Sequence, residues 1–493
     1  MYYIGYDIGS SSIKVALVDA NSGANIITKN EPEVEMEILA VQKDWAEQDP
    51  EMWWNYICTA TQKVIAESKI DASKIAGIGI SYQMHGLVVV DKQLKALRNS
   101  IIWCDSRAVE IGNKAFTDLE EKCTTQLLNS PGNFTASKLK WVKDNEPEIY
   151  QKIYKYMLPG DFIAAKLSGK VCSTKNSLSE GILWDYKENK VADWLLEYYG
   201  ISPDLTPEVV DNFTNQGEVS KQASEKTGLP EGIPVVYRAG DQTNNALSLN
   251  VFKPGEVAST GGTSGVIYAV TDQLKSKESI RINNFAHINV AATDKNVGKL
   301  LCINGSGIQY RWLLNNLDVS SYQEMNQKAS EVAVGSEGVV ILPFGNGAER
   351  MLNNRNIDAH IINLNFNIHN KAHLCRAALE GIAFSFVYGM EILKNDNAKI
   401  DVIRAGNDNL YRSEIFSKTV ATLIGQEIEI YNTTGAIGAA RAVGLRNGDF
   451  KTFGENITKN DHVITFEPLK NKAVYEEAYQ NWKTELEIRL NKN

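Results

Sequence analysis

Two turns rich in Gly, Ser and Thr are the segments of this chain best suited to bind an anion. They lie within YYIGYDIGSSSIKVALVD (2–19) and EVASTGGTSGVIYAV (256–270), and each separates two apolar runs. This is the pattern of a β-hairpin with a small-residue tip. Small residues let backbone N–H groups approach an anion, and hydroxyls add further donors. Because the two turns are about half a chain apart, they predict two lobes that clamp one polyphosphate.

Carboxylates beside such turns could take part in phosphate transfer. Asp7 ends the apolar run before the first turn; it either stabilises that turn or holds a hard cation such as Mg²⁺ through water. Lys14 on the returning strand either reaches a phosphate or is solvated. Asp241 follows a predicted strand at 232–240. It either accepts a proton from a hydroxyl or caps a helix that begins at Gln242.

The commoner nucleotide-binding motifs are absent. Gly169-Lys170 is followed by Val171 and has no upstream Gly, so it is not a phosphate-binding loop of the GxxxxGK[ST] type. The segment around Gly77 and Gly79 has Tyr82 where a third Gly would complete GxGxxG. If the chain binds ATP, the paired hairpins are therefore the expected site.

Composition is that of an ordinary globular chain. Its 493 residues are 43% apolar and 23% charged, and this length favours two to four domains. The net charge of −9 disfavours binding to nucleic acid or to an anionic membrane. No apolar run approaches the roughly 20 residues that span a bilayer, and no leader-like segment opens the chain, so a cytoplasmic location is predicted. The six cysteines show no metal-ligand spacing and are expected to be buried, reduced thiols.

Strands and helices are predicted to alternate along the chain, which indicates an α/β fold with mixed sheets. Asp49-Pro50 is a helix-start signal, and Gly425 is a helix-stop signal. Lys253-Pro254-Gly255 is the best candidate for a hinge, and it predicts an N-terminal lobe at 1–250 and a C-terminal lobe at 251–493. Further strands are expected at 74–80, 87–91 and 427–431, and further helices at 51–68, 135–145, 190–200, 371–394, 410–424 and 435–444.

Five segments together resemble the FGGY family of carbohydrate kinases. They are the hairpin with Asp7, Ser81-Tyr-Gln-Met-His-Gly86, Ala239-Gly-Asp-Gln242, Ser259-Thr-Gly-Gly-Thr-Ser264 and Ala405-Gly-Asn-Asp-Asn409. They occur in the family's order and cover nearly the whole chain. The resemblance implies a two-lobed fold of the actin, Hsp70 and hexokinase (ribonuclease H-like) type with a cleft between the lobes. It also implies transfer of a phosphoryl group from ATP–Mg²⁺ to a sugar hydroxyl.

The resemblance assigns roles to individual residues. Asp241 becomes the general base, and Asp7 holds the metal through water. Nucleotide-binding roles fall to Gly9, Ser10, Ser11, Ser12, Lys14, Gly261, Gly262, Thr263, Ser264, Gly406, Asn407 and Asn409. Two departures from the family pattern weaken this assignment of roles. Ala405-Gly406 replaces the usual Gly-Gly pair, and the segment ending in Glu349-Arg350 lacks the family's following Thr-Pro, so that a surface ion pair is expected there.

The sugar-side residues implied by the resemblance are Met84, His85, Trp103, Asp241 and Gln242, with Asp105 in the same loop as Trp103. His85 could instead be structural, and Trp103 could be a core residue. The run Gln83-Met84-His85-Gly86 most resembles the xylulokinase branch, which implies phosphorylation of D-xylulose to D-xylulose 5-phosphate. The alternatives are a family kinase for another sugar, polyol or sugar acid such as ribulose or gluconate, and a non-catalytic actin-like ATPase. The sequence sets no oligomeric state, and a homodimer is allowed.

Overall fold

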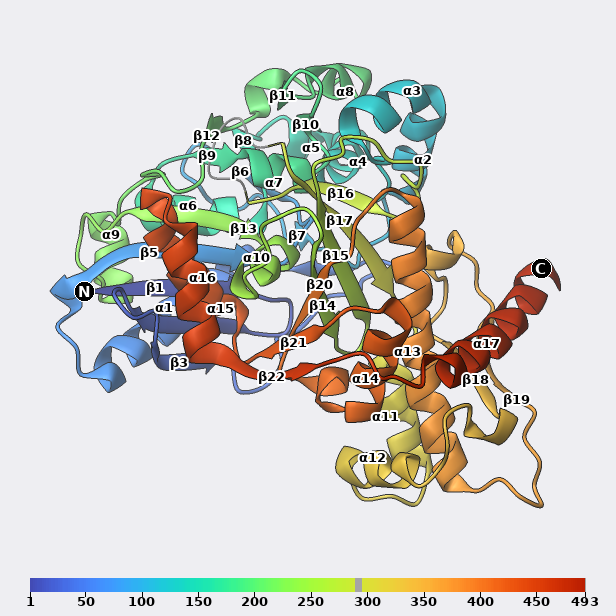
Figure 1. Ribbon diagram of the computed structural model, residues 1–493. Helices are drawn as coiled ribbons and strands as arrows, with labels where there is room; N and C mark the ends of the chain where they lie inside the picture. The colour runs from blue at the N-terminus through green and yellow to red at the C-terminus, as the bar shows by residue number, and fades with distance from the viewer. Residues whose placement is uncertain (289–294, 493) are drawn as a thin grey trace.

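Two mixed sheets form the framework of the computed structural model, which describes residues 1–288 and 295–492 (Figure 1). The first has the order β13 (Val235–Gly240), β5 (Ile75–Tyr82), β1 (Tyr2–Ile8), β2 (Ile13–Asp19) and β3 (Asn25–Glu31). The second has the order β16 (Asn283–Ala286), β17 (Val297–Ile303), β15 (Gly265–Thr271), β14 (Glu256–Gly261), β20 (Val402–Gly406), β21 (Ile428–Tyr431) and β22 (His462–Phe466).

The same local arrangement opens both sheets. In the first, β1 is antiparallel to β2 and parallel to β5. In the second, β14 is antiparallel to β15 and parallel to β20. Each predicted phosphate turn is thus the tip of a hairpin beside a parallel strand, and the predicted α/β fold with mixed sheets is confirmed.

Helices cover these sheets and join their strands. The longer ones are α1 (Pro50–Ser68), α2 (Val109–Asp118), α4 (Thr135–Asn145), α6 (Pro159–Ser168), α10 (Asp241–Ser248), α11 (Gly307–Asn316), α12 (Tyr322–Ser330), α13 (Lys371–Asn395), α14 (Glu414–Ile424), α15 (Gly435–Ala442), α16 (Phe450–Asp461) and α17 (Lys472–Lys492). Shorter ones include α7 (Lys175–Glu180), α8 (Asp193–Tyr198) and α9 (Lys221–Thr227). Short strands pair outside the two main sheets, among them β4 (Glu47–Gln48) with β7 (Ser100–Ile101), β6 (Val88–Val90) with β8 (Lys155–Met157), β10 (Trp184–Asp185) with β11 (Lys190–Val191), and β18 (Val340–Phe344) with β19 (Asp358–Ile362).

Helix α15 lies against the first sheet, although more than half of the chain separates it from strands β1 and β5 (Figure 1). Two strand glycines make this close approach possible. A Cβ added at Gly5 would lie 2.1 Å from the carbonyl oxygen of Ala436, and one added at Gly79 would lie 1.9 Å from that of Ala439. The helix backbone therefore rests directly on β1 and β5.

The apolar core is continuous across the predicted lobe boundary. One buried cluster contains Met84 and Leu139 from the N-terminal half together with Phe285 and Leu300 from the C-terminal half. Strand β16 is also tied to the N-terminal half, because Asn129 accepts the backbone N–H of Asn284 at 2.8 Å and donates to its carbonyl at 2.7 Å. The division at 250/251 falls in the connection between α10 and β14 and stays a prediction.

Among the described residues, no helix is long and apolar enough to cross a membrane. All six cysteines are free thiols, as predicted, but only Cys123, Cys172 and Cys375 are buried. Cys58 and Cys302 are partly buried, and Cys104 is exposed.

Candidate active site

The first hairpin brings Asp7 next to the start of α15. The turn is closed by the Gly9 N–H, which donates to the Ser12 carbonyl at 3.0 Å. The Asp7 carboxylate accepts a hydrogen bond from the Ser81 hydroxyl of β5 at 2.9 Å. A Cβ added at Gly435 would lie 2.6 Å from Asp7 Oδ2, so the carboxylate occupies the space that a side chain there would need. Asp7 is therefore fixed beside the phosphate turn by two neighbouring elements.

Asp241 begins α10 directly after the last residue of β13. The cap position of this helix is Gly240, so the alternative in which Asp241 caps a helix beginning at Gln242 is wrong. Desolvation, with a further contribution from the nearby charge of Asp7, raises the pKa of the Asp241 carboxyl to about 7. A carboxylate with a pKa in this range is a good proton acceptor near neutral pH.

Helix α10 connects Asp241 to both phosphate hairpins. The Asn244 side chain donates to the Gly435 carbonyl at 2.9 Å, next to Asp7. The following residue, Asn245, donates to the Thr260 hydroxyl at 3.1 Å, just before the second turn. The two predicted hairpins and the predicted base are therefore brought together by a single helical turn.

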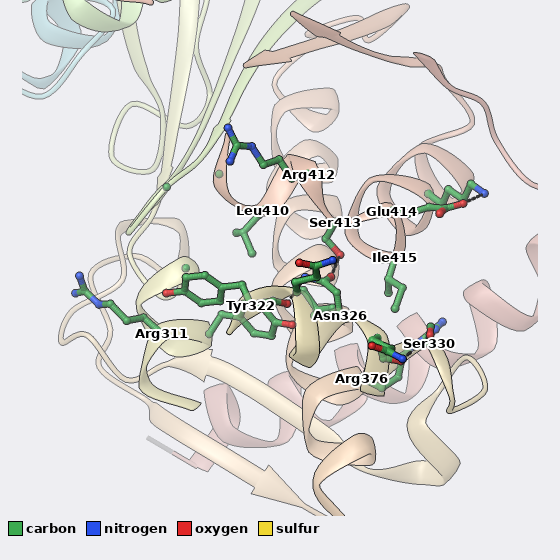
Figure 2. Close-up of a pocket in the computed structure, with 18 of the residues that line it drawn as sticks. Arg311, Tyr322, Asn326, Ser330, Arg376, Leu410, Arg412, Ser413, Glu414 and Ile415 are labelled. Atoms are coloured by element: carbon green, nitrogen blue, oxygen red, sulfur yellow. Dashed lines mark hydrogen bonds and ion pairs between the residues drawn. The ribbon is translucent and has the colours of Figure 1, made fainter. Parts of the chain in front are cut away.

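The second hairpin opens into a cavity of about 1100 Å³, which Figure 2 shows. Gly261, Gly262 and Thr263 line it, while Ser264 is exposed at the tip of the same turn. The start of α11 packs on this turn, because the Gly307 N–H donates to the Gly262 carbonyl at 3.2 Å. The rest of the wall was not predicted from the sequence; it includes Tyr310, Arg311, Tyr322, Asn326, Arg376 and Arg412.

Part of this wall carried a signal in the sequence. Ser306-Gly307, separated from the end of β17 by two residues, is a helix-start pattern with a glycine that permits close backbone approach. A Cβ at Gly307 would lie 2.3 Å from the Gly262 carbonyl oxygen, which is the contact that such a glycine serves. The contributions of α12 and α13 depend on tertiary packing and had no local signal.

The predicted adenosine loop lies at a neighbouring cavity. Gly406 ends β20, and Asn407 lines a second cavity of about 720 Å³ that shares Arg412 with the first. Asn409 begins a short 3₁₀ turn, Asn409–Arg412, and its side chain lies outside the described residues. The Ala405 side chain is fully buried in the apolar core of the C-terminal half. Its methyl group therefore lines neither of these two cavities.

On the sugar side, His85 lies between two aromatic rings from different halves of the chain. Its ring centroid is 4.6 Å from that of Phe134 and 5.3 Å from that of Phe285. Burial lowers the pKa of His85 to about 3, so the imidazole is neutral near pH 7. Nδ1 is 2.8 Å from the Glu180 carbonyl oxygen, which can only accept, so Nδ1 carries the proton. The other ring nitrogen, Nε2, remains an acceptor.

The other residues predicted on the sugar side differ in their burial and in their contacts. Met84 is buried in the shared core. Trp103 is 52% exposed and donates to the Ser10 hydroxyl at 3.4 Å, so the alternative of a core tryptophan is wrong. Asp105 is fully buried and binds the Arg107 guanidinium and the Ala46 N–H, each at 2.6 Å, so it supports the loop. Gln242 is partly buried beside Asp241.

The expected surface ion pair at Glu349-Arg350 is wrong. Glu349 is 1% exposed and accepts the N–H groups of Asn304 at 2.9 Å and Gly305 at 3.1 Å. Arg350 instead extends over the ring of Phe134, at 5.9 Å from its centroid, and donates to the Asn283 side chain. No ion pair joins Arg350 to a carboxylate in the part of the chain that the structure describes. A guanidinium from the C-terminal half thus lies beside the predicted sugar turn.

Comparison with known proteins agrees with this geometry. Residues 2–248 match the N-terminal domain of the FGGY family of carbohydrate kinases, and residues 257–444 match its C-terminal domain. The chain belongs to the FGGY family of carbohydrate kinases. It is accordingly an ATP-dependent carbohydrate kinase with the two-lobed fold of that family.

Individual relatives cover nearly all of the chain. It is 26% identical over 469 residues to a xylulose kinase of Bacillus subtilis (strain 168), with 92% of this chain and 90% of the relative covered. It is 27% identical to an L-xylulose/3-keto-L-gulonate kinase of Escherichia coli (strain K12), with 98% and 96% covered. The fold is similar to that of a xylulose kinase from Rhodospirillum rubrum, with a TM-score of 0.88, 23% identity and 99% of each chain covered.

Proposed function

We propose that the enzyme phosphorylates D-xylulose to D-xylulose 5-phosphate, with Asp241 as the general base. The position and pKa of Asp241 carry this proposal. The carboxylate lies one helical turn from the residue that contacts Thr260 and close enough to Asp7 to interact with its charge. A substrate hydroxyl placed there loses its proton to Asp241 as its oxygen attacks the γ-phosphorus, and ADP leaves.

The nucleotide is proposed to lie across the second hairpin, with its phosphates directed toward the first. Gly9, Ser10, Ser11 and Ser12 and Gly261–Ser264 offer backbone N–H groups and hydroxyls to the phosphates. Gly406, Asn407 and Asn409 are the proposed nucleoside contacts, and Lys14, opposite Asp7 in the β1–β2 pairing, is a phosphate contact. Such groups stabilise the charge that develops during phosphoryl transfer, where positioning provides most of the catalysis.

The residues present fit a magnesium ion that arrives with the nucleotide. No cluster of three or more His, Cys, Asp or Glu side chains occurs among the described residues, so no all-protein cage is present. Mg²⁺ in kinases needs only one or two carboxylates besides phosphate oxygens and water. Asp7 is proposed to hold it through water, and when bound the ion neutralises charge on the phosphates.

The xylulose assignment rests on the sugar turn and on the names of the relatives. His85 Nε2 is free to accept a hydrogen bond from a sugar hydroxyl, and Trp103 and Gln242 are proposed to complete the sugar site. The Bacillus relative is named for xylulose, whereas the Escherichia relative is named for L-xylulose and a keto sugar acid.

A second candidate substrate is a sugar acid, and Arg350 favours it. Its guanidinium lies beside the ring that contacts His85, and burial lowers its pKa, so a charged partner would stabilise it. A carboxylate is the group that a guanidinium pairs with best. A neutral ketose would instead offer Arg350 only hydroxyl or carbonyl oxygens.

The test is sugar-dependent ADP release measured with D-xylulose, L-xylulose, D-ribulose, D-gluconate and 3-keto-L-gulonate. The proposal expects the highest kcat/KM with D-xylulose. Arg350→Met separates the candidates, because it should reduce kcat/KM for a sugar acid more than for a ketose. Preference for a sugar acid would transfer the assignment to the second candidate. ATP turnover that no sugar stimulates would contradict both.

A further inference from the structure

Glu180, the last residue of α7, contacts both the predicted sugar turn and Gly240, the residue directly before the predicted base. Its carboxylate oxygen Oε1 accepts the backbone N–H of Gly240 at 2.9 Å, directly before Asp241. Its backbone carbonyl accepts Nδ1–H of His85 at 2.8 Å. Glu180 is fully buried, and no cation pairs with it among the described residues.

Gly240 is shaped to receive the Glu180 carboxyl group. A Cβ added at Gly240 would lie 2.4 Å from Oε2 and 2.6 Å from Oε1 and Cδ of Glu180. The carboxyl group therefore occupies the place of a side chain at position 240 and packs against the backbone there. Gly240 caps α10, and Asp241 is the first helical residue. This contact therefore fixes the point at which the chain passes from β13 into the helix that begins with Asp241.

The surroundings of Glu180 favour its neutral form. Burial raises its pKa well above the ordinary value, and the charges of Asp241 and Asp161 raise it further. In the described structure Oε2 has no hydrogen-bond partner, so the group is not held as an ionised member of a network. A neutral carboxyl has the shape of a Gln amide, and Gln can still accept the Gly240 N–H through its carbonyl oxygen.

We propose that Glu180 is a positioning residue that fixes Asp241 relative to His85, through its side chain on one side and its backbone on the other. This inference rests on the proposed function of Asp241 as the base. The sugar hydroxyl would be held by His85 and deprotonated by Asp241, so a change in their separation would reduce the rate. Misplacement of reacting groups by about 1 Å can cost about 10²-fold.

The test compares Glu180→Gln with Glu180→Ala by kcat, KM for sugar, KM for ATP and thermal unfolding. Glu180→Gln should retain kcat within about threefold. Glu180→Ala should lower kcat by about 10- to 100-fold and leave the KM for ATP unchanged, because the nucleotide cavity is on other elements. Asp396→Asn is the control, since Asp396 is equally buried but binds Lys299 away from these groups. It should lower the melting temperature and keep kcat.

The outcomes of these measurements decide the proposal. Wild-type kcat in folded Glu180→Ala would overturn it, as would equal losses in the Gln and Ala variants. If Glu180→Ala does not fold, Gly240→Ala tests the same contact, because its methyl group must displace the carboxyl; unchanged kcat there would also overturn it. Asp241→Asn separates the two levels. If Asp241→Asn turns over like the wild type, the proposed base is wrong, whereas an inactive Asp241→Asn with an active Glu180→Ala removes only the positioning role.

Discussion

The charge on Asp241 is poorly solvated and faces the charge on Asp7, and this arrangement should be visible in the pH dependence of the enzyme. The proposed base works only when ionised, and its pKa is raised to about 7. We therefore expect kcat/KM to be constant above this pH and to fall about tenfold per pH unit below it. Steady-state rates between pH 5 and 9 would measure this limb. A profile without a limb between pH 6 and 8 would contradict the assigned pKa.

The same pKa shift has the opposite effect on stability. A carboxyl with a pKa raised in the folded state favours folding while it is protonated, and this advantage is lost as the pH rises through the folded pKa. Asp241→Asn, which is always neutral, should therefore unfold at higher denaturant concentration than the wild type at pH 8, and by a smaller margin at pH 5. Urea unfolding at both pH values tests this. A variant less stable than the wild type at pH 8 would contradict the cause given for the shift.

Asp7 should act on the nucleotide rather than on the sugar. Its carboxylate contacts Ser81 and the Gly435 backbone beside the phosphate turn, and it makes no contact with His85 or Trp103 in the described structure. We expect Asp7→Ala to lower kcat by about 10²-fold or more and to raise the Mg²⁺ concentration needed for half-maximal rate. Titration of Mg²⁺ and sugar in the variant would measure both effects. A shift confined to the sugar KM would contradict the assignment.

Single residues differed in how well the sequence predicted them. Residues that belong to a local motif, such as Asp7 and Asp241, were placed beside the predicted turns. The surroundings of Glu349 and Arg350 were not predicted, because they come from segments distant in the sequence. Arg350 reaches Phe134, and Glu349 supports the loop at Asn304, and neither partner is evident from the local sequence.

At the level of elements, the contact between α15 and the first sheet should be sensitive to a single methyl group. Gly79→Ala would place a Cβ 1.9 Å from the Ala439 carbonyl oxygen, so the helix must move away from β5. We expect destabilisation of about 1–3 kcal/mol, and reduced activity because α15 begins beside Asp7. Gly444→Ala is the control, since a Cβ there would meet Tyr3 at an ordinary 3.5 Å. Equal stability of the two variants would show that the contact is not tight.

Elements with a cap or a continuous periodic pattern were predicted well. Asp49 caps α1, α4 spans Thr135–Asn145 as expected, and Gly425 ends α14. The helices expected at 190–200 and 410–424 are shorter. In the first, residues Lys190–Val191 pair with β10, and only Asp193–Tyr198 is helical. In the second, Ser413 caps the helix, and the residues before it form a separate 3₁₀ turn, a cap signal that the periodic pattern obscured.

For the whole molecule, we expect the two halves to approach each other when both substrates bind. The nucleotide contacts proposed here come from both hairpins, and water must be excluded from the transferred phosphoryl group. Small-angle scattering of Asp241→Asn with ATP and sugar should give a smaller radius of gyration than with either ligand alone, because this variant holds both without turnover. An identical radius in all states would indicate a cleft that is closed before binding.

The contact between α15 and the first sheet also has a consequence for the order in which the protein is made. Strands β1 and β5 are synthesised within the first 82 residues, but the helix that covers their glycine face begins at residue 435. At translation rates of about 5–20 residues per second, the gap between these events is roughly 20–70 s. Throughout that interval the nascent sheet has one face without its native cover. We therefore expect the nascent chain to be most prone to aggregation before α15 has been synthesised.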